Sequence, residues 1–479
     1  MAWQLWSNSS FAKVLRTFTQ IFVLFSVLSA GFQFITQSLS WGTFSTSLML
    51  IGGSAFIARF IDGKFKKKVL FLFSTTVIQT LFLGASFFTL PPIEIKEEVS
   101  IPEYLVQVEH ESRSEFIAFA TSQDRIEIKG QFNPIDKNET VLDDYFVVDV
   151  LGSNPKKIGA VLENLPYVKY IENNEEVYTP AFESPLSAEN SEQFIFEDPL
   201  NNQQWSLINT EMKQFYEVAK NIESKKTVKL FILDTGVDGK HEDLKEVFKS
   251  NGRLNDRDKR GHGTHCAGIA AAVTGNNIGI SSFNFDGRIE IYSEKVLSDF
   301  GGGTQDGIIN GMIRAVDKGA DVISMSLGGR SSDSKQKAYN AAVKYANRRG
   351  CIVVVAAGNS KDKATKYSPA NSKGVITVAA SDFQNELASF SNTLEGIKYG
   401  VYAPGVNILS TYPDNKYESL SGTSMATPFV AGLVALMKSI KPELQTEEAH
   451  DILNASIQEN SGVPIVKPKT ALEKLIEKN

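Results

Sequence analysis

Three residues far apart in the chain have the side-chain types that nucleophilic catalysis by serine requires. Asp234 ends the apolar run FILD, His262 lies in GHGTHCAG, and Ser424 lies in SGTSMATPFVAG. A serine becomes a nucleophile when an imidazole takes its proton and a carboxylate holds that imidazole in the right tautomer. Each residue also has a simpler interpretation: Asp234 as a turn residue before Gly236, and Ser424 as a helix N-cap. Their occurrence in one chain favours catalysis.

An acyl-transfer site also needs hydrogen-bond donors for the oxyanion that forms during the attack. The run VVVAAGNS ends a predicted strand with Asn359, whose side-chain amide can donate. The backbone N–H of Ser424 can donate a second bond from a helix N-terminus, where the helix dipole favours negative charge. Asn359 therefore joins the predicted catalytic set.

A metal centre is the competing interpretation of the histidine motif. His262 and His265 lie three residues apart, with Cys266 beside them, and all three are ligand types for zinc. The neighbouring sequence offers no well-placed further ligand, so we expect His265 and Cys266 to pack in the core. We expect His241 and His450 on the surface. If the protein were instead a metal-dependent hydrolase, a chelator would abolish its activity immediately.

The segment from residue 198 onward alternates short apolar runs with helical patterns. This order predicts an α/β fold with a mostly parallel sheet and helices on both of its faces. Functional side chains in such folds lie beyond the carboxyl ends of the strands, where Asp234 and Asn359 stand. The predicted strands are VKLFILD, IEIYSEKVL, DVISMSL, CIVVVAAG and VITVAA, and the predicted helices include GIINGMIRAVDKG and KQKAYNAAVKYANRRG.

The chain resembles the subtilisin-like serine proteases, the subtilases, over about residues 198–460. The segments that carry the resemblance are DTGVDGKHEDL, GHGTHCAG, VISMSLGG, VVVAAGN and LSGTSMATPFVAG. The cysteine in HGTHCAG, together with YSPA, is closest to the proteinase K branch. The resemblance implies a serine endopeptidase with a triad and an oxyanion donor, namely Asp234, His262, Ser424 and Asn359. A catalytically inactive homologue that only grips peptides is the alternative.

The resemblance also implies where an extended peptide or protein substrate binds. One edge of the cleft presents its backbone for strand addition, and a glycine-rich run at 301–303 forms the opposite edge. The implied cleft residues are Ser326, Leu327, Gly328, Gly301 and Gly302.

Lys366 falls where the main specificity pocket of the family closes. Long cationic side chains keep their charge in water, so we expect this lysine to turn to solvent and leave a permissive apolar P1 preference. Some tolerance of acidic P1 residues is the alternative.

The serine mechanism requires no cofactor, but structural calcium is possible. TGNNIGI at 274–280 resembles the calcium loop that many subtilases insert after the histidine helix. Ca²⁺ takes six or more oxygen ligands, including carboxylates and carbonyls. A Gly-Asn turn with no ion is the alternative, because a neutral asparagine is a weak ligand alone. The ligands implied by family position are Asp198, Asp243 and Asn276, with the carbonyls of Thr274, Ile278 and Ile280.

Residues 1–93 predict a membrane region. No charged residue occurs in residues 17–58, and residues 69–93 form a second uncharged run that ends beyond a proline pair. These lengths predict about three transmembrane helices. A signal peptide, or a second run too polar to span, is the alternative. The expected spans are residues 18–36, 43–61 and 69–89.

The charges of this region predict its orientation. Residues 1–90 carry seven Lys and Arg and one acid, and the basic loop RFIDGKFKKK separates the second and third expected spans. This loop, and the N-terminus with Lys13 and Arg16, should stay in the cytoplasm. Three crossings then deliver everything after Pro91 to the other side. We therefore expect a membrane protein whose catalytic domain is extracytoplasmic.

Residues 102–179 predict a small α+β unit with the strand and helix order of a ferredoxin-like split motif. The run LENLPYVKYIENNEEV in this unit resembles the inhibitory propeptide of the subtilases. The resemblance implies that the unit templates the catalytic domain and leaves its last strand in the cleft, with self-cleavage near residues 179–200. A polar linker at 180–197 and the catalytic domain at 198–479 complete the expected organisation.

The overall composition excludes some partners. The net charge is -6 and the acidic part of the chain has no basic stripe, so nucleic acid is not an expected partner. Cys266 and Cys351 are too few for a disulfide framework, and we expect two buried free thiols. The expected partners are a peptide or protein substrate, the chain's own propeptide and the membrane.

Overall fold

The computed structural model describes residues 103–138, 140–152, 154–179, 182–183, 198–331, 337–457 and 462–478. Two expected features lie outside this part of the chain: the membrane spans at 18–36, 43–61 and 69–89, and most of the linker at 180–197. Among the described residues, one helix, α11 (Thr423–Ile440), is long and apolar enough to cross a membrane. Every residue of α11 is buried inside the protein, as in a core helix.

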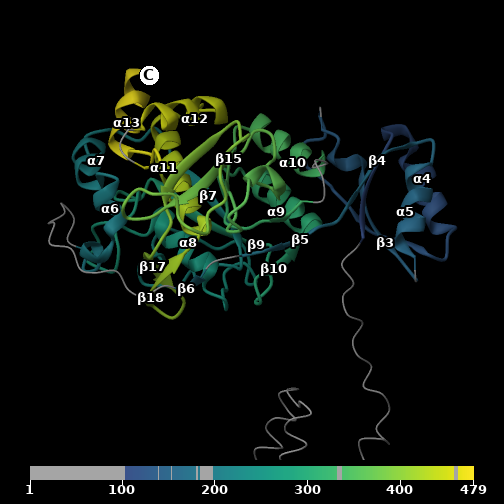
Figure 1. The fold of residues 1–479 in the computed structure, drawn as a ribbon, viewed down its shortest axis with the longest axis horizontal. Helices are drawn as coiled ribbons and strands as arrows, with labels where there is room; N and C mark the ends of the chain where they lie inside the picture. The colour runs from purple at the N-terminus through teal and green to yellow at the C-terminus, as the bar shows by residue number, and fades with distance from the viewer. Residues whose placement is uncertain are drawn as a thin grey trace, which may run out of the picture. The chain divides into compact units, whose positions relative to one another are not determined.

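A parallel sheet lies at the centre of the catalytic part (Figure 1). Its strand order is β16-β15-β13-β11-β7-β9-β8, and each neighbouring pair is parallel. The central strands are rich in Val and Ile and are buried, as expected of a sheet covered on both faces. The strands are β7 (Val228–Asp234), β8 (Phe248–Lys249), β9 (Ile289–Lys295), β11 (Val322–Met325), β13 (Ile352–Ala356), β15 (Ile376–Ser381) and β16 (Gly400–Pro404).

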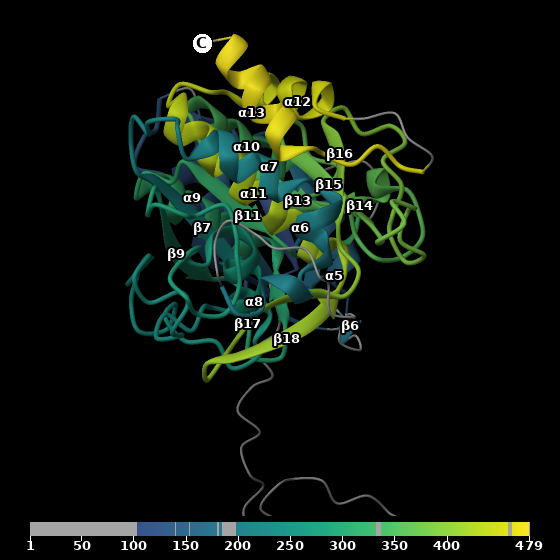
Figure 2. The ribbon, with the colours of Figure 1, turned by 90° about the vertical axis from the view of Figure 1, so that its left-hand side faces the viewer.

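Helices cover both faces of this sheet (Figure 2), which confirms the predicted α/β architecture. α8 (His262–Ala271) and α11 contribute to one apolar core, and α9 (Gln305–Asp317) and α10 (Lys337–Arg348) contribute to the other. The first core also takes side chains from α6 (Trp205–Asn209), α7 (Met212–Ala219), α12 (Thr446–Ala455) and α13 (Pro468–Glu477).

A hairpin of β17 (Ile408–Tyr412) and β18 (Lys416–Ser421) leads directly into α11. The chain passes from β18 to α11 through Gly422 alone, so the end of the hairpin fixes where the helix begins. This hairpin was not foreseen, because its strands are short and carry polar residues at many positions.

The residues before the catalytic part form a second sheet, which is antiparallel with the order β2-β3-β1-β4. One face of it packs under its own two helices, and the other face, which includes Leu105 and Tyr145, joins the core of α9 and α10. The elements are β1 (Tyr104–Val108), α4 (Arg113–Thr121), β2 (Ile126–Gln131), β3 (Tyr145–Val150), α5 (Pro155–Glu163) and β4 (Val168–Asn173).

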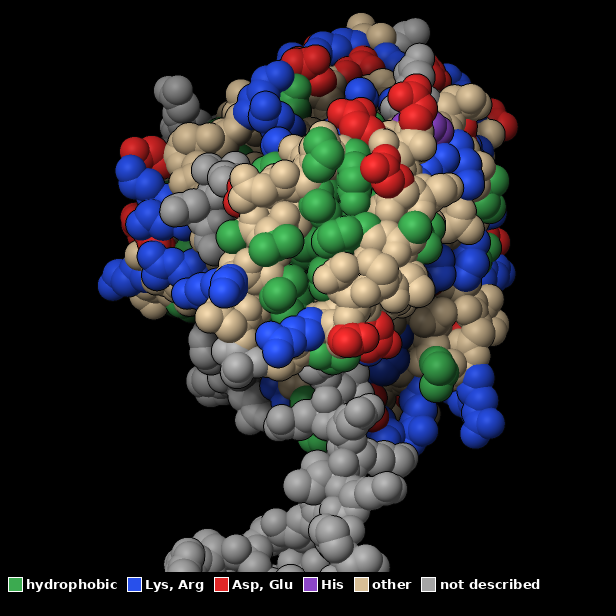
Figure 3. Space-filling model, turned by 90° about the vertical axis from the view of Figure 1, so that its right-hand side faces the viewer, with side chains coloured by type: hydrophobic (Ala, Val, Ile, Leu, Met, Phe, Trp, Pro, Cys, Tyr) green, Lys and Arg blue, Asp and Glu red, His purple; other side chains and the backbone are tan. Residues whose placement is uncertain are grey.

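The outer side of this small unit carries apolar surface (Figure 3). Ile117 on α4 and Val161 on α5 are among the large apolar side chains that remain exposed. Small folded units bury a smaller fraction of their surface than large ones, so exposed apolar side chains are expected on a unit of this size.

Candidate active site

The end of β7 and the start of α8 bring a carboxylate and an imidazole together. Asp234 is the last residue of β7, and His262 is the first residue of α8, after Gly261 in a left-handed conformation with φ 88°. Nδ1 of His262 lies 2.8 Å from Oδ1 of Asp234. Both side chains are buried, so this pair is shielded from water.

His262 is protonated more readily than a histidine in water, because of its surroundings. Burial is the largest single influence and lowers the pKa of His262. The charge and hydrogen bond of Asp234, together with the neighbouring Cys266, outweigh burial and raise that pKa well above its usual value. Within the described part of the chain, Nε2 of His262 is buried and has no hydrogen-bond partner. The imidazole is therefore arranged to accept a proton at Nε2 while Asp234 holds Nδ1.

Ser424 is the second residue of α11 and is buried. Its hydroxyl donates to the carbonyl oxygen of Ser326 at 3.2 Å, and no hydrogen bond to His262 is formed in the described structure. Cys266 lies beside both groups, with Sγ 4.0 Å from Nδ1 of His262 and 3.5 Å from the carbonyl oxygen of Ser424. Catalytic hydrogen bonds are often incomplete before substrate binds, so proton transfer requires the Ser424 hydroxyl to turn toward Nε2.

Pro428, inside α11, has a specific effect on the nucleophile. Because proline has no N–H, the carbonyl oxygen of Ser424, four residues earlier, lacks its helical donor. The hydroxyl of Ser326 donates to that oxygen at 2.7 Å, and the thiol of Cys266 also donates to it. The missing helical bond thus lets neighbouring side chains hold the backbone of the nucleophile.

Asn359 follows β13 and is attached to the first turn of α11. Its Oδ1 accepts from the backbone N of Thr423 at 2.9 Å and from the Thr423 hydroxyl at 2.8 Å. These two bonds fix the plane of the amide group, in which Nδ2 lies on the side opposite Oδ1. The backbone N–H of Ser424 belongs to the same helix start, where amides lack partners within the helix. Asn359 is thus fixed at the start of α11, beside the residue that precedes Ser424.

The substrate-binding edges suggested by the sequence are both paired with the protein's own strand β5 (Glu176–Tyr178). On one side, Tyr178 and Gly328 exchange backbone hydrogen bonds of 3.2 and 3.1 Å. On the other side, β5 is antiparallel to β10 (Gly302–Thr304), and the N–H of Thr179 donates to the carbonyl of Gly301 at 3.2 Å. The cleft therefore receives an extended chain as a middle strand.

Two residues beside the cleft edges, one from the catalytic part and one from β5, are buried in an apolar core. Leu327 is almost fully buried, and Val177 of β5 is buried in the same apolar core. A Cβ at Gly303 would lie 2.7 Å from a methyl carbon of Leu297, so a larger residue there would displace the edge strand. Lys366 is half exposed and pairs with Asp362 at 2.7 Å, so its charge is directed to solvent, as expected.

Several side chains of the histidine motif have structural roles. Nε2 of His265 lies 2.9 Å from the carbonyl oxygen of Glu418, and burial lowers the pKa of His265 to about 3. The group that does cluster is Asp234, His262 and Cys266, which the catalytic pair already explains. Among the described residues, the competing zinc-type set of His262, His265 and Cys266 is therefore not formed, and Cys266 is a buried free thiol, as predicted, like Cys351.

The expectation that His241 lies on the surface is wrong. His241 is fully buried, and its Nε2 lies 3.0 Å from the carbonyl oxygen of Lys416. The hairpin of β17 and β18 covers the histidine and supplies this partner. Because this hairpin was not predicted, the burial of His241 beneath it was not predicted either. His450, in contrast, is partly exposed and packs against Tyr399.

The expected calcium ligands gather around the loop that follows α8. Asp243 accepts from Nδ2 of Asn276 and from the backbone N of Ile280, each at 2.9 Å. Asp198 accepts from the N–H of Gly275 on the same loop. The hydroxyl of Thr274 bonds to the backbone of Ser282, and the backbone N–H of Ile278 donates to Oδ1 of Asn276.

Charge at this loop favours a cation. Burial, with the negative charge of Asp198 as a further contribution, raises the pKa of Asp243 to about 7. Two buried carboxylates and a side-chain amide are oxygen ligands of the kind that Ca²⁺ takes, so the residues fit such an ion. An ion bound here would neutralise the charges of Asp198 and Asp243 and would take no part in peptide hydrolysis.

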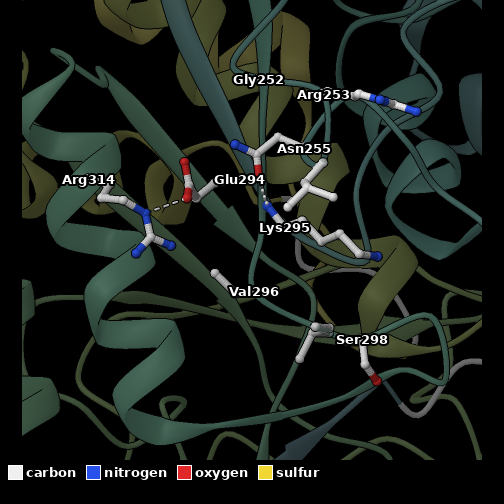
Figure 4. A pocket seen from close by; sticks show the side chains of 10 residues that line it. Gly252, Arg253, Asn255, Glu294, Lys295, Val296, Ser298 and Arg314 are labelled. Carbon is white, nitrogen blue, oxygen red and sulfur yellow. Dashed lines mark hydrogen bonds and ion pairs between the residues drawn. The ribbon is translucent and has the colours of Figure 1, made fainter. Parts of the chain in front are cut away.

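A cavity of about 650 Å³ lies beside the cleft edge (Figure 4). It is lined by Val296 and Ser298, which lead to the glycine-rich edge, and by the ion pair of Arg314 with Glu294 at 2.6 Å. None of the triad residues lines this cavity. The predicted catalytic residues therefore lie outside this cavity.

Comparison with known proteins agrees with the geometry. A profile of the subtilase family matches residues 225–470. Thermitase from Thermoactinomyces vulgaris is 44% identical over 44% of this chain and 75% of its own length. Subtilisin DY from Bacillus licheniformis is 41% identical over 48% of this chain and 83% of its own length.

Two further comparisons extend this agreement. An alkaline protease from Alkalihalobacillus alcalophilus is 33% identical over 73% of this chain and 81% of its own length. A solved structure of a protease from Pseudoalteromonas arctica has a TM-score of 0.50 and 29% identity, and covers 58% of this chain and 99% of that protease. The family match and these relatives agree with the Asp234–His262 pair and the buried Ser424, and the chain belongs to the subtilase family of serine endopeptidases.

Proposed function

We propose that this subtilase is a membrane-tethered endopeptidase that acts outside the cytoplasm and cuts its own chain to mature. The observation that carries the proposal is the position of β5, which occupies the cleft as an extended substrate would. A catalytically inactive peptide-binding homologue is not favoured, because the triad residues and Asn359 are all present in working surroundings.

Cleavage begins with proton transfer from the Ser424 hydroxyl to Nε2 of His262. The raised pKa of His262 makes it a stronger base, and Asp234 stabilises the imidazolium that forms. Ser424 Oγ then forms a bond to the carbonyl carbon, while Asn359 Nδ2 and the Ser424 N–H bind the oxyanion.

The second half of the reaction reverses these roles. His262 donates its proton to the leaving amine as the C–N bond breaks, and an acyl-enzyme remains on Ser424. A water molecule then gives a proton to His262 and attacks the ester carbonyl, which releases the acid and restores the hydroxyl. No metal or organic cofactor enters this sequence of steps.

The strand pairings on either side of Ser424 indicate which bond is cut in maturation. Tyr178 pairs with Gly328 on one side, and Phe182 pairs with Ser421 on the other. Ser421 lies three residues before Ser424, so the described residues on both sides of 180–181 pair with segments of the predicted cleft. We therefore propose that self-cleavage occurs at one of the bonds between Thr179 and Phe182.

Contacts of the small unit support its assignment as an inhibitory propeptide. Glu172 of β4 accepts from the N–H groups of Lys337 and Ala338 at 3.1 and 3.2 Å, and so caps the start of α10. Asn174 accepts from the N–H of Asp306 in the first turn of α9. Both helices of that face of the catalytic part thus take a cap from the small unit.

The alignment with the alkaline protease gives independent support. A match over 355 residues is longer than the stretch from residue 225 to residue 479, so it includes residues before the subtilase match. The similarity therefore extends into the region assigned to the propeptide and linker.

Membrane tethering rests on the uncharged runs in residues 17–58 and 69–93 and on the basic loop between the second and third expected spans. A cut between Thr179 and Phe182 leaves both runs on the N-terminal fragment. We propose that the matured catalytic domain is then held at the membrane by the non-covalent contacts of the small unit.

Maturation can be tested with the full chain in membranes. The wild type should yield two fragments, with the N-terminus of the larger one within residues 180–182 by mass spectrometry. Ser424→Ala should remain one full-length chain, and Lys366→Ala, a change at an exposed side chain, should be processed like the wild type. Cleavage of Ser424→Ala at the same bond would contradict self-processing.

Calcium should stabilise the protein more at pH 8 than at pH 5. The raised pKa of Asp243 means that its ionisation destabilises the fold as pH rises from about 4 to about 7, and a cation offsets this cost. At 100 times its Kd, an ion that binds the native state contributes about 2.7 kcal/mol, or about 5–10 °C in Tm. Differential scanning fluorimetry with Ca²⁺ or EDTA measures this effect.

Asp243→Asn is the matched control, because it removes the carboxylate and keeps the size of the side chain. It should lose most of the calcium response and its pH dependence. An equal calcium response in Asp243→Asn and wild type would contradict the ligand assignment.

A further inference from the structure

Asp258 lies on the loop before α8 and is buried, although it belongs to none of the sequence motifs that predicted the triad. Its Oδ1 accepts from the hydroxyl of Thr235 at 2.9 Å and from the N–H groups of Arg260 and Gly261 at 3.0 and 2.9 Å. Its Oδ2 accepts from the N–H of Thr264 at 2.9 Å and from the Thr264 hydroxyl at 2.8 Å. One carboxylate thus takes five donors.

These donors come from the two segments that carry the catalytic pair. Thr235 directly follows Asp234 at the end of β7, and its N–H donates to Oδ1 of Asp234 at 2.7 Å. Gly261 and Thr264 flank His262 in the first turn of α8. Asp258 therefore links the segment of the carboxylate to the segment of the imidazole.

Thr235 completes the connection. While its hydroxyl donates to Asp258, the same oxygen accepts from the N–H of Gly263, the residue after His262, at 3.0 Å. Gly261, at the N-cap, offers no side chain to cap α8. Asp258 and Thr235 satisfy the amides that an N-cap side chain would otherwise take.

We infer that Asp258, acting through Thr235, is a positioning residue that sets the distance between Asp234 and His262. Its effect on catalysis passes through the Asp234–His262 hydrogen bond and not through contact with substrate. A role in capping alone would change only the stability of α8. The two roles therefore differ in what their loss does to the catalytic rate and to the titration of His262.

Asp258→Asn tests this inference, because it keeps the size and turns one acceptor into a donor that faces N–H groups. We expect kcat to fall about 10–100-fold at nearly unchanged KM, since small displacements of catalytic groups cost up to about 100-fold. The acidic limb of the kcat/KM profile should move to lower pH, because a weaker contact with Asp234 lowers the pKa of His262. Active sites are titrated so that rates refer to folded enzyme.

Thr235→Val and Thr235→Ser provide a second test that does not depend on the folding of Asp258→Asn. Valine removes the bridging hydroxyl and should reproduce the lower kcat and the shifted limb, whereas serine keeps the hydroxyl and should behave like the wild type. The Asp258→Asn and Thr235→Val effects should not multiply in the double variant, because both break one connection.

Asp321→Asn is the matched control. Asp321 also accepts a backbone N–H, that of Lys229, but it stands before β11, at the opposite end of the sheet from the triad. It should lower Tm without changing the acidic limb. If Asp258→Asn and Thr235→Val lower only Tm and leave kcat and the acidic limb unchanged, Asp258 is a capping residue and the inference is overturned.

Discussion

Replacing Ser424 by alanine is expected to lower kcat about 10⁶-fold, the size of loss known for removal of the nucleophile from a subtilisin-type triad. Without the hydroxyl, no acyl-enzyme forms, although Asn359 and the cleft edges remain able to bind peptide. KM, or the Kd of a peptide measured directly, should therefore change little. The measurement is peptide hydrolysis by the matured enzyme, with the alanine variant matured by added wild type.

Thr427→Ser is a suitable control for the Ser424 variant. The Thr427 hydroxyl donates to the carbonyl of Thr423 within α11, and serine can keep this bond. This variant should retain activity. Substantial hydrolysis by Ser424→Ala, above what residual wild type explains, would show that another group is the nucleophile.

Asp234→Asn is expected to lower kcat about 10⁴-fold, because an amide in place of the carboxylate stabilises the wrong tautomer of His262. Its pH profile is equally informative. In the wild type the charge of Asp234 raises the pKa of His262, and activity is lost when His262 is protonated as pH falls. In the variant the charge of Asp234 no longer opposes burial, which lowers that pKa, so the acidic limb should move to lower pH.

The rate and the pH profile together separate this role from a purely structural one. Circular dichroism should show an intact fold, because Asn can still accept the N–H of Thr235. An acidic limb that stays at the same pH in Asp234→Asn would contradict the proposed electrostatic pairing of Asp234 with His262.

The parallel sheet and the positions of Asp234 and Asn359 could be predicted from the sequence for a clear physical reason. A buried parallel strand is a continuous run of Val, Ile and Leu, and the first polar residue after that run marks the carboxyl end of the strand. The runs that end at Asp234 and at Asn359 have this form, so both residues could be placed at one edge of the sheet.

The β17–β18 hairpin and the burial of His241 could not be predicted in the same way. Strands of a short hairpin are specified by partners distant in the chain, and their own residues alternate little. The burial of His241 depends on that hairpin, because Lys416 supplies both cover and a hydrogen bond.

Asp258 and Pro428 were missed as parts of the site for a different reason. Both act on the backbone around catalytic residues rather than on substrate. Asp258 is an acidic residue outside the motifs, and Pro428 fits a proline that is tolerated in the first turns of a helix. A signal was nevertheless available for Pro428: a proline at the sixth position of a helix leaves one carbonyl without its donor, and that carbonyl belongs to Ser424.

Active-site labelling with a fluorophosphonate tests the central claim, that Asp234, His262 and Ser424 act as one unit. The account predicts that the matured wild type takes up one label per chain, found on Ser424 by peptide mass spectrometry. Labelling should be abolished in Ser424→Ala and slowed by orders of magnitude in His262→Ala. Label found on another residue, or equal labelling rates in wild type and His262→Ala, would contradict the account.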